Sequence, residues 1–246
     1  METKHSYTSE FVTSTHIMDF QSALRPSGLM EIMQEAAGGN SDALGCGRAD
    51  LLKKNMVWVL LRCQIFMDRW PTMGQTASVL TYPKQPRHGM YPRYFVVRDG
   101  QGQEIGKAFS LWTLLDIESR KSVQSPEVAS SIPDNSELKP CLPGMPPMVT
   151  PLDTEPVVGL REPVYSDLDA NCHVNNVRYL DWCCDALGID VLRDMELANF
   201  AVCFLQEIVP GQKIRTELRR KGNLFSFSGM EGTTRHFEIS GELRPR

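Results

Sequence analysis

The residues most able to do chemistry lie in one polar cluster between positions 166 and 176. Asp169, Asn171 and His173 follow one another at steps of two, so in an extended segment they would point to one side. A histidine can polarise or protonate a reacting group, a carboxylate can orient it, and a carboxamide can donate to an oxyanion. Backbone N–H groups at the start of a following helix add positive potential. The pattern therefore predicts a hydrolytic site.

The same cluster also has a purely structural explanation. Asp, Asn and Ser between a strand and a helix often only cap the helix and turn the chain. Asp167, Asn175 and Asn176 fit that explanation. It does not account for the alternate spacing of the three residues above, so both explanations stay open on residue types alone.

A fourth candidate is Glu207, at the end of a predicted strand over residues 200–207. It shares a face of that strand with Ala201, Cys203 and Leu205. A partly desolvated carboxylate there could take a proton from water or attack a carbonyl. The alternative is an exposed strand end beside a Pro-Gly turn.

The sequence lacks the pattern of residues that a thiol nucleophile, a metal site or a nucleotide cofactor would require. Cys172 stands one step from His173, so in an extended chain it points to the other side and is not expected to be a nucleophile. Asp169 and His173 could bind a metal, but further ligands at suitable spacing are missing. The sequence has no GxGxxG, P-loop or GxSxG pattern. We therefore expect no metal and no cofactor.

The elements that must position these residues occur twice. In each half, a turn that opens on Asp precedes one helix with a single apolar stripe, and strands follow. The stripe contains Leu29, Ile32, Met33, Ala36 and Ala37 in the first half and Val177, Leu180, Cys184 and Leu187 in the second. The repeated order suggests a duplication.

Superposing the segment 19–25 on 167–173 aligns an Asp-apolar pair ahead of both helices. In this alignment Gln21, Ala23 and Arg25 stand where the second half has its Asp, Asn and His. The first half therefore lacks the residues needed to catalyse the same reaction. One active site per chain follows.

Alternating apolar residues and glycine turns mark strands after both helices. The expected strands cover residues 57–67, 76–82, 91–98 and 104–116, and then 200–207, 213–221, 224–230 and 236–243. Hairpin-linked strands form antiparallel sheets, and each sheet must curve to bury its helix. We predict an α+β fold, a tandem (double) hot-dog in which two curved antiparallel sheets each wrap around a long helix.

Eight of the sixteen prolines lie between Pro126 and Pro156, where neither a helix nor a central strand is expected to persist. We therefore predict a proline-rich linker over residues 121–156. It would join an N-terminal hot-dog domain, residues 1–120, to a C-terminal one, residues 157–246, that carries the chemistry.

Composition limits the compartments and partners that we expect for this protein. The chain of 246 residues is 41% apolar with a net charge of -4, and no run approaches the roughly 18 apolar residues of a membrane span. Charges of both signs are interspersed, so a nucleic-acid partner is not expected. The polar first ten residues carry no targeting pattern, and the seven cysteines resemble buried thiols. We expect a cytoplasmic protein with no membrane insertion.

The stretch SDLDANCHVNNVRY, from Ser166 to Tyr179, closely resembles the signature of the acyl-acyl-carrier-protein thioesterases of plants and bacteria. Other segments resemble that family's first half, and the likeness covers nearly the whole chain. They are residues 25–27, 34–37, 44–45, 58–62, 67–71 and 108–112, with Gly74 and Arg120.

This resemblance implies hydrolysis of the thioester between a fatty acyl chain and the phosphopantetheine arm of acyl carrier protein. The family uses no metal. Its functional Asp, Asn and His fall on Asp169, Asn171 and His173, and its downstream Glu falls on Glu207. Plant members have a Cys after that Glu, but this chain has Ile208, which argues against an obligatory thiol nucleophile.

We hypothesise that Asn171 and the helix-start N–H groups hold the carbonyl, while Glu207 and His173, oriented by Asp169, activate water. Direct attack by Glu207 stays open. The resemblance also places the acyl-chain pocket in the first half, with Met30, Ile32 and Met33 as candidate substrate contacts.

Because acyl carrier protein is acidic, its docking surface should be basic. The candidates are Lys84, Arg87, Arg93 and Arg98, or Arg215, Arg219, Arg220 and Lys221. An acyl-CoA thioesterase, a dehydratase and a non-catalytic acyl-binding protein are the competing functions, since hot-dog folds carry all of them. A homodimer is possible.

Overall fold

The computed structural model describes residues 5–246, so the first four residues of the polar N-terminal segment lie outside it. The chain divides into two compact units, an N-terminal unit, Met1–Pro146, and a C-terminal unit, Pro147–Arg246. The division falls inside the segment 121–156 that the prolines marked as a linker. Each unit is described by itself.

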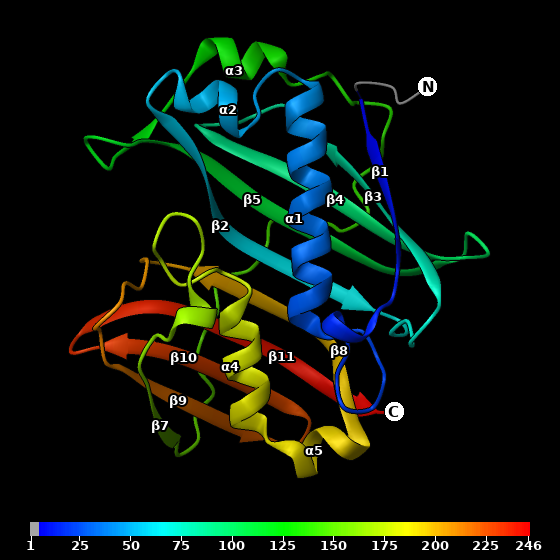
Figure 1. Ribbon diagram of the computed structural model, residues 1–246, viewed down its shortest axis with the longest axis vertical. Helices are drawn as coiled ribbons and strands as arrows, with labels where there is room; N and C mark the ends of the chain where they lie inside the picture. Colours follow the sequence, from blue (N-terminus) through cyan, green and yellow to red (C-terminus); the bar gives the residue numbers. More distant parts are fainter. Residues whose placement is uncertain (1–4) are drawn as a thin grey trace. The chain divides into compact units, whose positions relative to one another are not determined.

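The N-terminal unit is a curved antiparallel sheet with one long helix (Figure 1). Its elements are β1 (Tyr7–Val12), the short helix η1 (Thr15–Ile17), α1 (Pro26–Ala43), α2 (Arg48–Leu52), β2 (Met56–Met67), β3 (Thr76–Pro83), β4 (Met90–Asp99), β5 (Glu104–Asp116), β6 (Ser122–Val123) and α3 (Pro126–Ser131). The strand order is β1-β3-β4-β5-β2, and β6 pairs with β5. Helix α1 packs against β1 and β3.

The C-terminal unit repeats this plan. Its elements are β7 (Val157–Arg161), η2 (Tyr165–Asp167), α4 (Arg178–Leu187), α5 (Ile189–Asp194), β8 (Met195–Phe204), β9 (Ile214–Lys221), β10 (Leu224–Glu231) and β11 (Thr234–Pro245). Its strands follow the order β7-β9-β10-β11-β8, and every pairing is antiparallel. Strand by strand this matches the order in the N-terminal unit. The predicted repeat of the element order and the predicted tandem hot-dog fold are confirmed.

The apolar stripes explain where both helices lie. Helix α1 begins at a proline, whose missing N–H costs nothing in the first turn, and buries Leu29, Met30 and Met33. Helix α4 buries Tyr179, Leu180, Cys183 and Leu187. It ends at Gly188, whose φ of +87° lies in the left-handed region that favours glycine.

The proline-rich segment is less irregular than predicted. Helix α3 forms inside it because Ser125 accepts a hydrogen bond from the Val128 N–H and Pro126 occupies the first turn. Val128, Leu142 and Val149 are buried. The expectation that no helix persists there is wrong, since a proline at the start of a helix does not oppose it.

Within the described part of the chain, no helix is long and apolar enough to cross a membrane.

Candidate active site

The predicted polar cluster forms a tight turn rather than an extended segment. Leu168 and Val174 form a β-bridge that closes the turn, and the Asp169 N–H donates to the His173 carbonyl oxygen at 2.9 Å. Cys172 adopts a left-handed conformation with a φ of +60°. The expectation that alternate residues point to one side of an extended chain is therefore wrong. Hydrogen bonds across the turn bring the residues together instead.

Asp169 organises this turn through its carboxylate. Its Oδ1 accepts hydrogen bonds from the backbone N–H of Asn171 at 2.8 Å and of His173 at 3.4 Å, and its Oδ2 lies 3.4 Å from Asn171 Nδ2. The geometry does not support the hypothesis that Asp169 orients the imidazole, because its contacts are with backbone N–H groups and with the Asn171 amide. Asp169 holds the backbone of His173 and the amide of Asn171.

The imidazole of His173 lies against Glu207. The distance from His173 Nδ1 to Glu207 Oε2 is 3.3 Å, and the side chains are 27% and 37% exposed, respectively. A histidine and a carboxylate at this distance can pass a proton between them and can both be reached by water.

Glu207 does not lie on strand β8, which ends at Phe204. The expectation that it shares a strand face with Leu205 is therefore wrong, and Leu205 itself is 45% exposed. The loop is tied to the turn, because the Val174 N–H donates to the Ile208 carbonyl oxygen at 2.8 Å. This long-range bond brings Glu207 to His173.

Tyr179, for which the sequence indicated no role, lies beside the site. It is buried, and its ring stacks on Phe237 with centroids 4.3 Å apart. Burial, together with the nearby carboxylates of Asp169 and Glu207, raises the pKa of its hydroxyl. The hydroxyl is therefore held in its protonated form near the two carboxylates. The only sequence signal was its place at the end of the polar motif.

The N-terminal unit contains the same turn. Asp19 Oδ1 accepts from the backbone N–H groups of Gln21 and Ala23, both at 2.9 Å, and Ser22 has a φ of +61°. A β-bridge between Met18 and Leu24 closes it. Asp19 therefore corresponds to Asp169, and the predicted alignment of Asp19 with Asp167 is wrong by two residues.

The corrected alignment shows how the first turn differs. Gln21 stands at the position of Asn171, and Ala23 stands at the position of His173. The Leu24 N–H donates to Pro71 as Val174 does to Ile208, so the buried Trp70 stands where the second unit has Glu207. The first turn keeps the carboxylate that shapes it but lacks both proton-transfer groups. The expectation of no such chemistry in the first half was argued from the incorrect alignment; in the corrected one, Ala23 and Trp70 replace His173 and Glu207.

The cysteines take no visible part in the site. Cys172 is exposed at the tip of the turn, and all seven cysteines are unbridged. In the described residues, no cluster of three or more His, Cys, Asp or Glu side chains could hold a metal ion.

A cavity of about 180 Å³ lies in the N-terminal unit, lined from α1 and from the sheet. Its walls include Ala37 of α1 and the aromatic rings of Trp58, Tyr91 and Trp112. Trp58 and Tyr91 meet edge to face with centroids 4.8 Å apart. The cavity is therefore mainly apolar with a rigid aromatic wall.

Arg93 is one of the polar residues that line this cavity, together with Gln34, Ser41 and Arg48. Its Nη1 donates to Asn40 Oδ1 at 2.8 Å and to Thr81 Oγ1 at 3.3 Å, and burial lowers the pKa of the guanidinium to about 10. Arg93 is only 6% exposed. It cannot belong to a basic docking surface, so that part of the prediction is wrong.

The three predicted substrate contacts do not line the cavity. Met30 and Met33 are buried in the core, and Ile32 is partly buried. Residues further along α1, from Gln34 to Ser41, line it instead. That Met30, Ile32 and Met33 contact an acyl chain stays a prediction.

Two family models match the chain. The acyl-ACP thioesterase N-terminal domain matches residues 4–132, and the acyl-ACP thioesterase C-terminal domain matches residues 155–241. Among curated proteins, the chain is 29% identical over 185 residues to a chloroplastic palmitoyl-acyl carrier protein thioesterase of Cuphea hookeriana. That match covers 70% of this chain and 42% of the relative. The matches cover between 42% and 52% of the length of these plant relatives, so the chain spans about half of them.

Solved structures show the same fold. An acyl-ACP thioesterase from Bacteroides thetaiotaomicron superposes with a TM-score of 0.89 at 24% identity, covering 99% of this chain and all of the other. A 12:0-ACP thioesterase from Umbellularia californica superposes with a TM-score of 0.85 at 20% identity, covering 100% of this chain and 99% of the other.

Proposed function

Because this chain belongs to the acyl-ACP thioesterase family, we propose that it hydrolyses fatty acyl-acyl carrier protein to a free fatty acid and holo-acyl carrier protein, which ends fatty acid synthesis. The observation that carries the proposal is the 3.3 Å contact between His173 Nδ1 and Glu207 Oε2, at the turn that Asp169 organises. The family supplies the substrate class, and this contact supplies the means of activating water.

In the proposed reaction, Glu207 and His173 take a proton from a water molecule whose oxygen attacks the thioester carbonyl carbon. Asn171 donates a hydrogen bond to the oxygen that becomes negative in the tetrahedral intermediate. The C–S bond then breaks, and His173 returns the proton to the departing thiolate. Asp169 takes no proton, because its oxygens hold the turn.

Direct attack by the Glu207 carboxylate, through an anhydride that water then opens, is the alternative route. A single turnover in heavy-oxygen water tests for this route. Activated water, or water that opens the anhydride at the acyl carbon, puts the label into the fatty acid, whereas label in Glu207 arises only when water opens the anhydride at the Glu207 carbonyl and would therefore establish the anhydride.

Free-thiol release tests the function itself. We expect release from acyl-carrier-protein thioesters of several chain lengths, and slower release from the matching coenzyme A thioesters. Faster release from coenzyme A would favour an acyl-CoA thioesterase. Bound acyl ligand with no thiol release from either series would favour a non-catalytic acyl-binding protein, and loss of water from a 3-hydroxyacyl thioester would indicate a dehydratase.

We also propose that the cavity in the N-terminal unit receives the acyl chain. Its aromatic and apolar walls fit an alkyl chain. Ala37 lies on the wall contributed by α1 and is buried, so a larger side chain there would project into the cavity.

Replacing Ala37 by phenylalanine should shift the preference toward shorter acyl chains. We expect kcat/KM for the longest good substrate to fall at least about tenfold relative to the shortest, since pockets discriminate single methylenes to this degree. Ala43→Phe is the matched control, because Ala43 lies on the same helix and is exposed. An unchanged chain-length profile in Ala37→Phe would place the acyl chain elsewhere.

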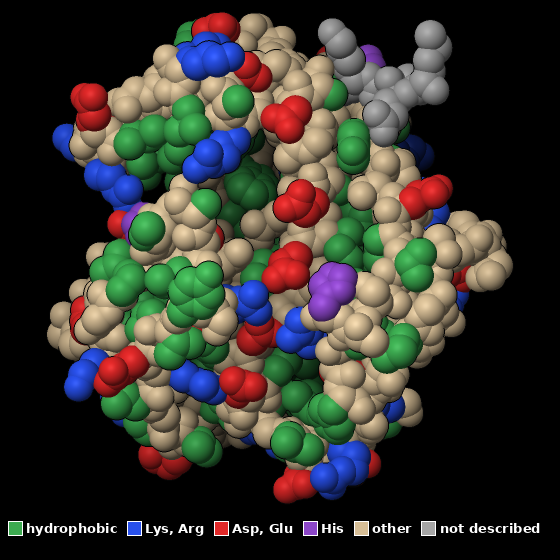
Figure 2. Space-filling model, viewed as in Figure 1, with side chains coloured by type: hydrophobic (Ala, Val, Ile, Leu, Met, Phe, Trp, Pro, Cys, Tyr) green, Lys and Arg blue, Asp and Glu red, His purple; other side chains and the backbone are tan. Residues whose placement is uncertain are grey.

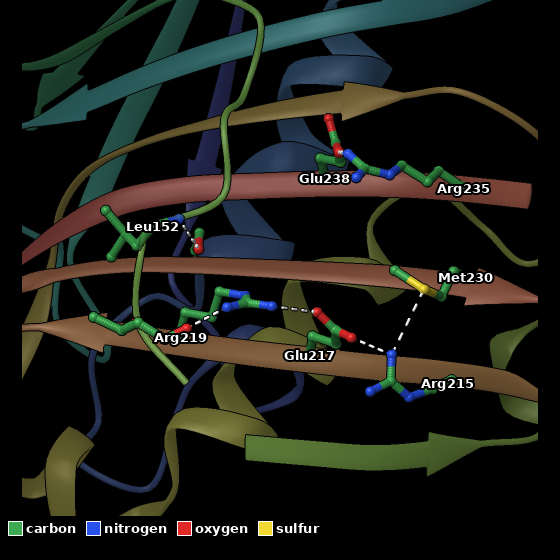
Figure 3. A network of polar contacts seen from close by, with 9 residues as sticks. Leu152, Arg215, Glu217, Arg219, Met230, Arg235 and Glu238 are labelled. Atoms are coloured by element: carbon green, nitrogen blue, oxygen red, sulfur yellow. Dashed lines mark hydrogen bonds and ion pairs between the residues drawn. The ribbon is translucent and has the colours of Figure 1, made fainter. Parts of the chain in front are cut away.

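Fewer of the basic candidates than the sequence suggested are available to contact acyl carrier protein. Figure 3 shows that Arg215 and Arg219 of β9 both reach Glu217, with Arg219 Nη2 at 2.9 Å from Glu217 Oε2. Arg219 also donates to the Thr154 carbonyl oxygen. Although burial opposes it, the hydrogen bonds from both arginines lower the pKa of Glu217. The charges of Arg215 and Arg219 are therefore partly neutralised within the unit.

Lys84 is similarly engaged, since its ammonium donates to the carbonyl oxygens of Asn135 and Leu138. On the face drawn in Figure 2, acidic and basic side chains are mixed rather than gathered by sign. The remaining candidates for contact with an acidic carrier are Arg87, Arg98, Arg220 and Lys221.

A cytoplasmic location is also part of the proposal. The seven unbridged cysteines fit a reducing compartment. Fractionation of cells that express the protein tests the location, and sedimentation of the purified protein tests the possible homodimer.

A further inference from the structure

The loop that carries Glu207 is held by one residue of strand β11. The backbone carbonyl oxygen of His236 accepts from the N–H groups of Leu205 at 2.9 Å and Gln206 at 3.1 Å. The His236 ring adds a third bond, with Nδ1 at 2.9 Å from the carbonyl oxygen of Glu207. Three consecutive residues beyond the end of β8 are thus bound to His236.

The ring of His236 has a defined orientation. A carbonyl oxygen can only accept, so Nδ1 carries the hydrogen in this contact. His236 is fully buried, and its Nε2 has no hydrogen-bond partner in the part of the chain that the structure describes. An unpartnered buried polar atom costs free energy, so its presence calls for a reason.

The N-terminal unit shows that the fold does not need a histidine here. Its equivalent residue is Ile105, whose carbonyl oxygen accepts from the N–H groups of Asp68 at 2.9 Å and Arg69 at 3.4 Å. In both units the next residue pairs with the last residue of the neighbouring strand, Gly106 with Met67 and Phe237 with Phe204. The backbone bonds are therefore shared by the two units. Isoleucine occupies this position in the unit whose loop has Trp70 in place of Glu207.

We propose that His236 is a positioning residue that holds Glu207 opposite His173. This inference rests on the proposed hydrolase function of that pair. The Nδ1–H of His236 fixes the carbonyl of Glu207, and the Val174 N–H fixes the carbonyl of the next residue, Ile208. Two successive peptide groups are thus anchored, one to β11 and one to the turn that bears His173. Because the Gln206 N–H is also bound to His236, the backbone is anchored on both sides of the Glu207 Cα, which limits the positions that its carboxylate can reach.

Two substitutions separate positioning from folding. His236→Ile installs the residue that the N-terminal unit uses and removes the unpartnered Nε2, so we expect the melting temperature to be maintained. We expect kcat to fall about 10- to 100-fold, because a small displacement of a reacting group has effects of this size. KM should stay within about twofold, because the acyl and carrier contacts are untouched.

His236→Asn is the conservative variant, because its side-chain amide can place a donor near the position of Nδ1. It should recover most of the lost kcat. Ile105→Val is the matched control in the N-terminal unit and should leave kcat unchanged. An unchanged kcat in His236→Ile would overturn the proposal. So would equal losses of kcat in His236→Ile and His236→Asn with lowered melting temperatures in both, because that result would indicate a purely structural role.

Amide hydrogen exchange decides the question independently of turnover. Loosening the Glu207 loop should weaken the Val174 to Ile208 bond, so exchange at the Val174 amide should accelerate in His236→Ile and stay slow in His236→Asn. If the wild type hydrolyses no thioester, the proposed function fails while this exchange result still tests the anchoring. Unchanged Val174 exchange in His236→Ile would refute the anchoring even in an active enzyme.

Discussion

Glu207→Gln should abolish most thiol release while leaving the protein folded. The substitution keeps the size of the side chain but removes the group that can accept a proton or attack the carbonyl. Proton transfer by a positioned side chain contributes about 10²- to 10⁴-fold, so we expect kcat to fall by that factor. Stopped-flow or endpoint thiol detection with an acyl-acyl carrier protein measures it.

The neighbouring exposed residue provides the control for this prediction. Gln206→Asn changes the same loop without touching the His173 to Glu207 contact, and it should retain wild-type kcat. If His173 and Glu207 act as one unit, the double variant His173→Ala/Glu207→Gln should lose little more than either single variant. A Glu207→Gln enzyme with more than about a tenth of the wild-type kcat would exclude Glu207 as the base or nucleophile.

The second large effect is expected at Asp169, and the duplication supplies its own control. Asp169→Ala removes the acceptor for the backbone N–H groups of Asn171 and His173 and for the Asn171 amide. Both the oxyanion donor and the imidazole then lose their fixed positions. We expect kcat to fall about 10²-fold, the cost of misplacing reacting groups by about 1 Å.

Asp19→Ala makes the same change in the turn of the N-terminal unit, where Asp19 accepts from Gln21 and Ala23. It should lower the free energy of unfolding by about 1–2 kcal/mol, as the loss of a charged acceptor for backbone N–H groups does. Its kcat should be unchanged. Chemical denaturation and thiol release on both variants give the comparison, and equal losses of kcat would mean that Asp169 acts only through stability.

Local patterns were enough to predict most of the fold. The strand over residues 104–116 was predicted with the bounds that β5 has, and most residues of the predicted apolar stripes of α1 and α4 are buried. These features depend on the helical and strand periods, which neighbouring residues determine. The repeated order of elements was likewise visible, and the matching strand orders of the two units confirm it.

Features that depend on hydrogen bonds between distant residues were predicted less well. The step-two spacing of Asp169, Asn171 and His173 predicts an extended segment, because spacing alone does not reveal that the Asp169 carboxylate folds the chain back on itself. The alignment of the two turns was wrong by two residues for the same reason. The prediction that Arg93 belongs to a basic surface was wrong. Burial of an arginine depends on partners such as Asn40 and Thr81, which lie far away in sequence.

The sequence by itself determined the tandem fold and identified Asp169, Asn171, His173 and Glu207 as candidates, because periodicity, residue chemistry and a specific motif are local properties. Only the tertiary structure decided which of them meet. It pairs His173 with Glu207 rather than with Asp169, and it places Tyr179 and His236 beside them. Those contacts form when β8, β11 and the turn come together, and no spacing along the chain encodes that approach.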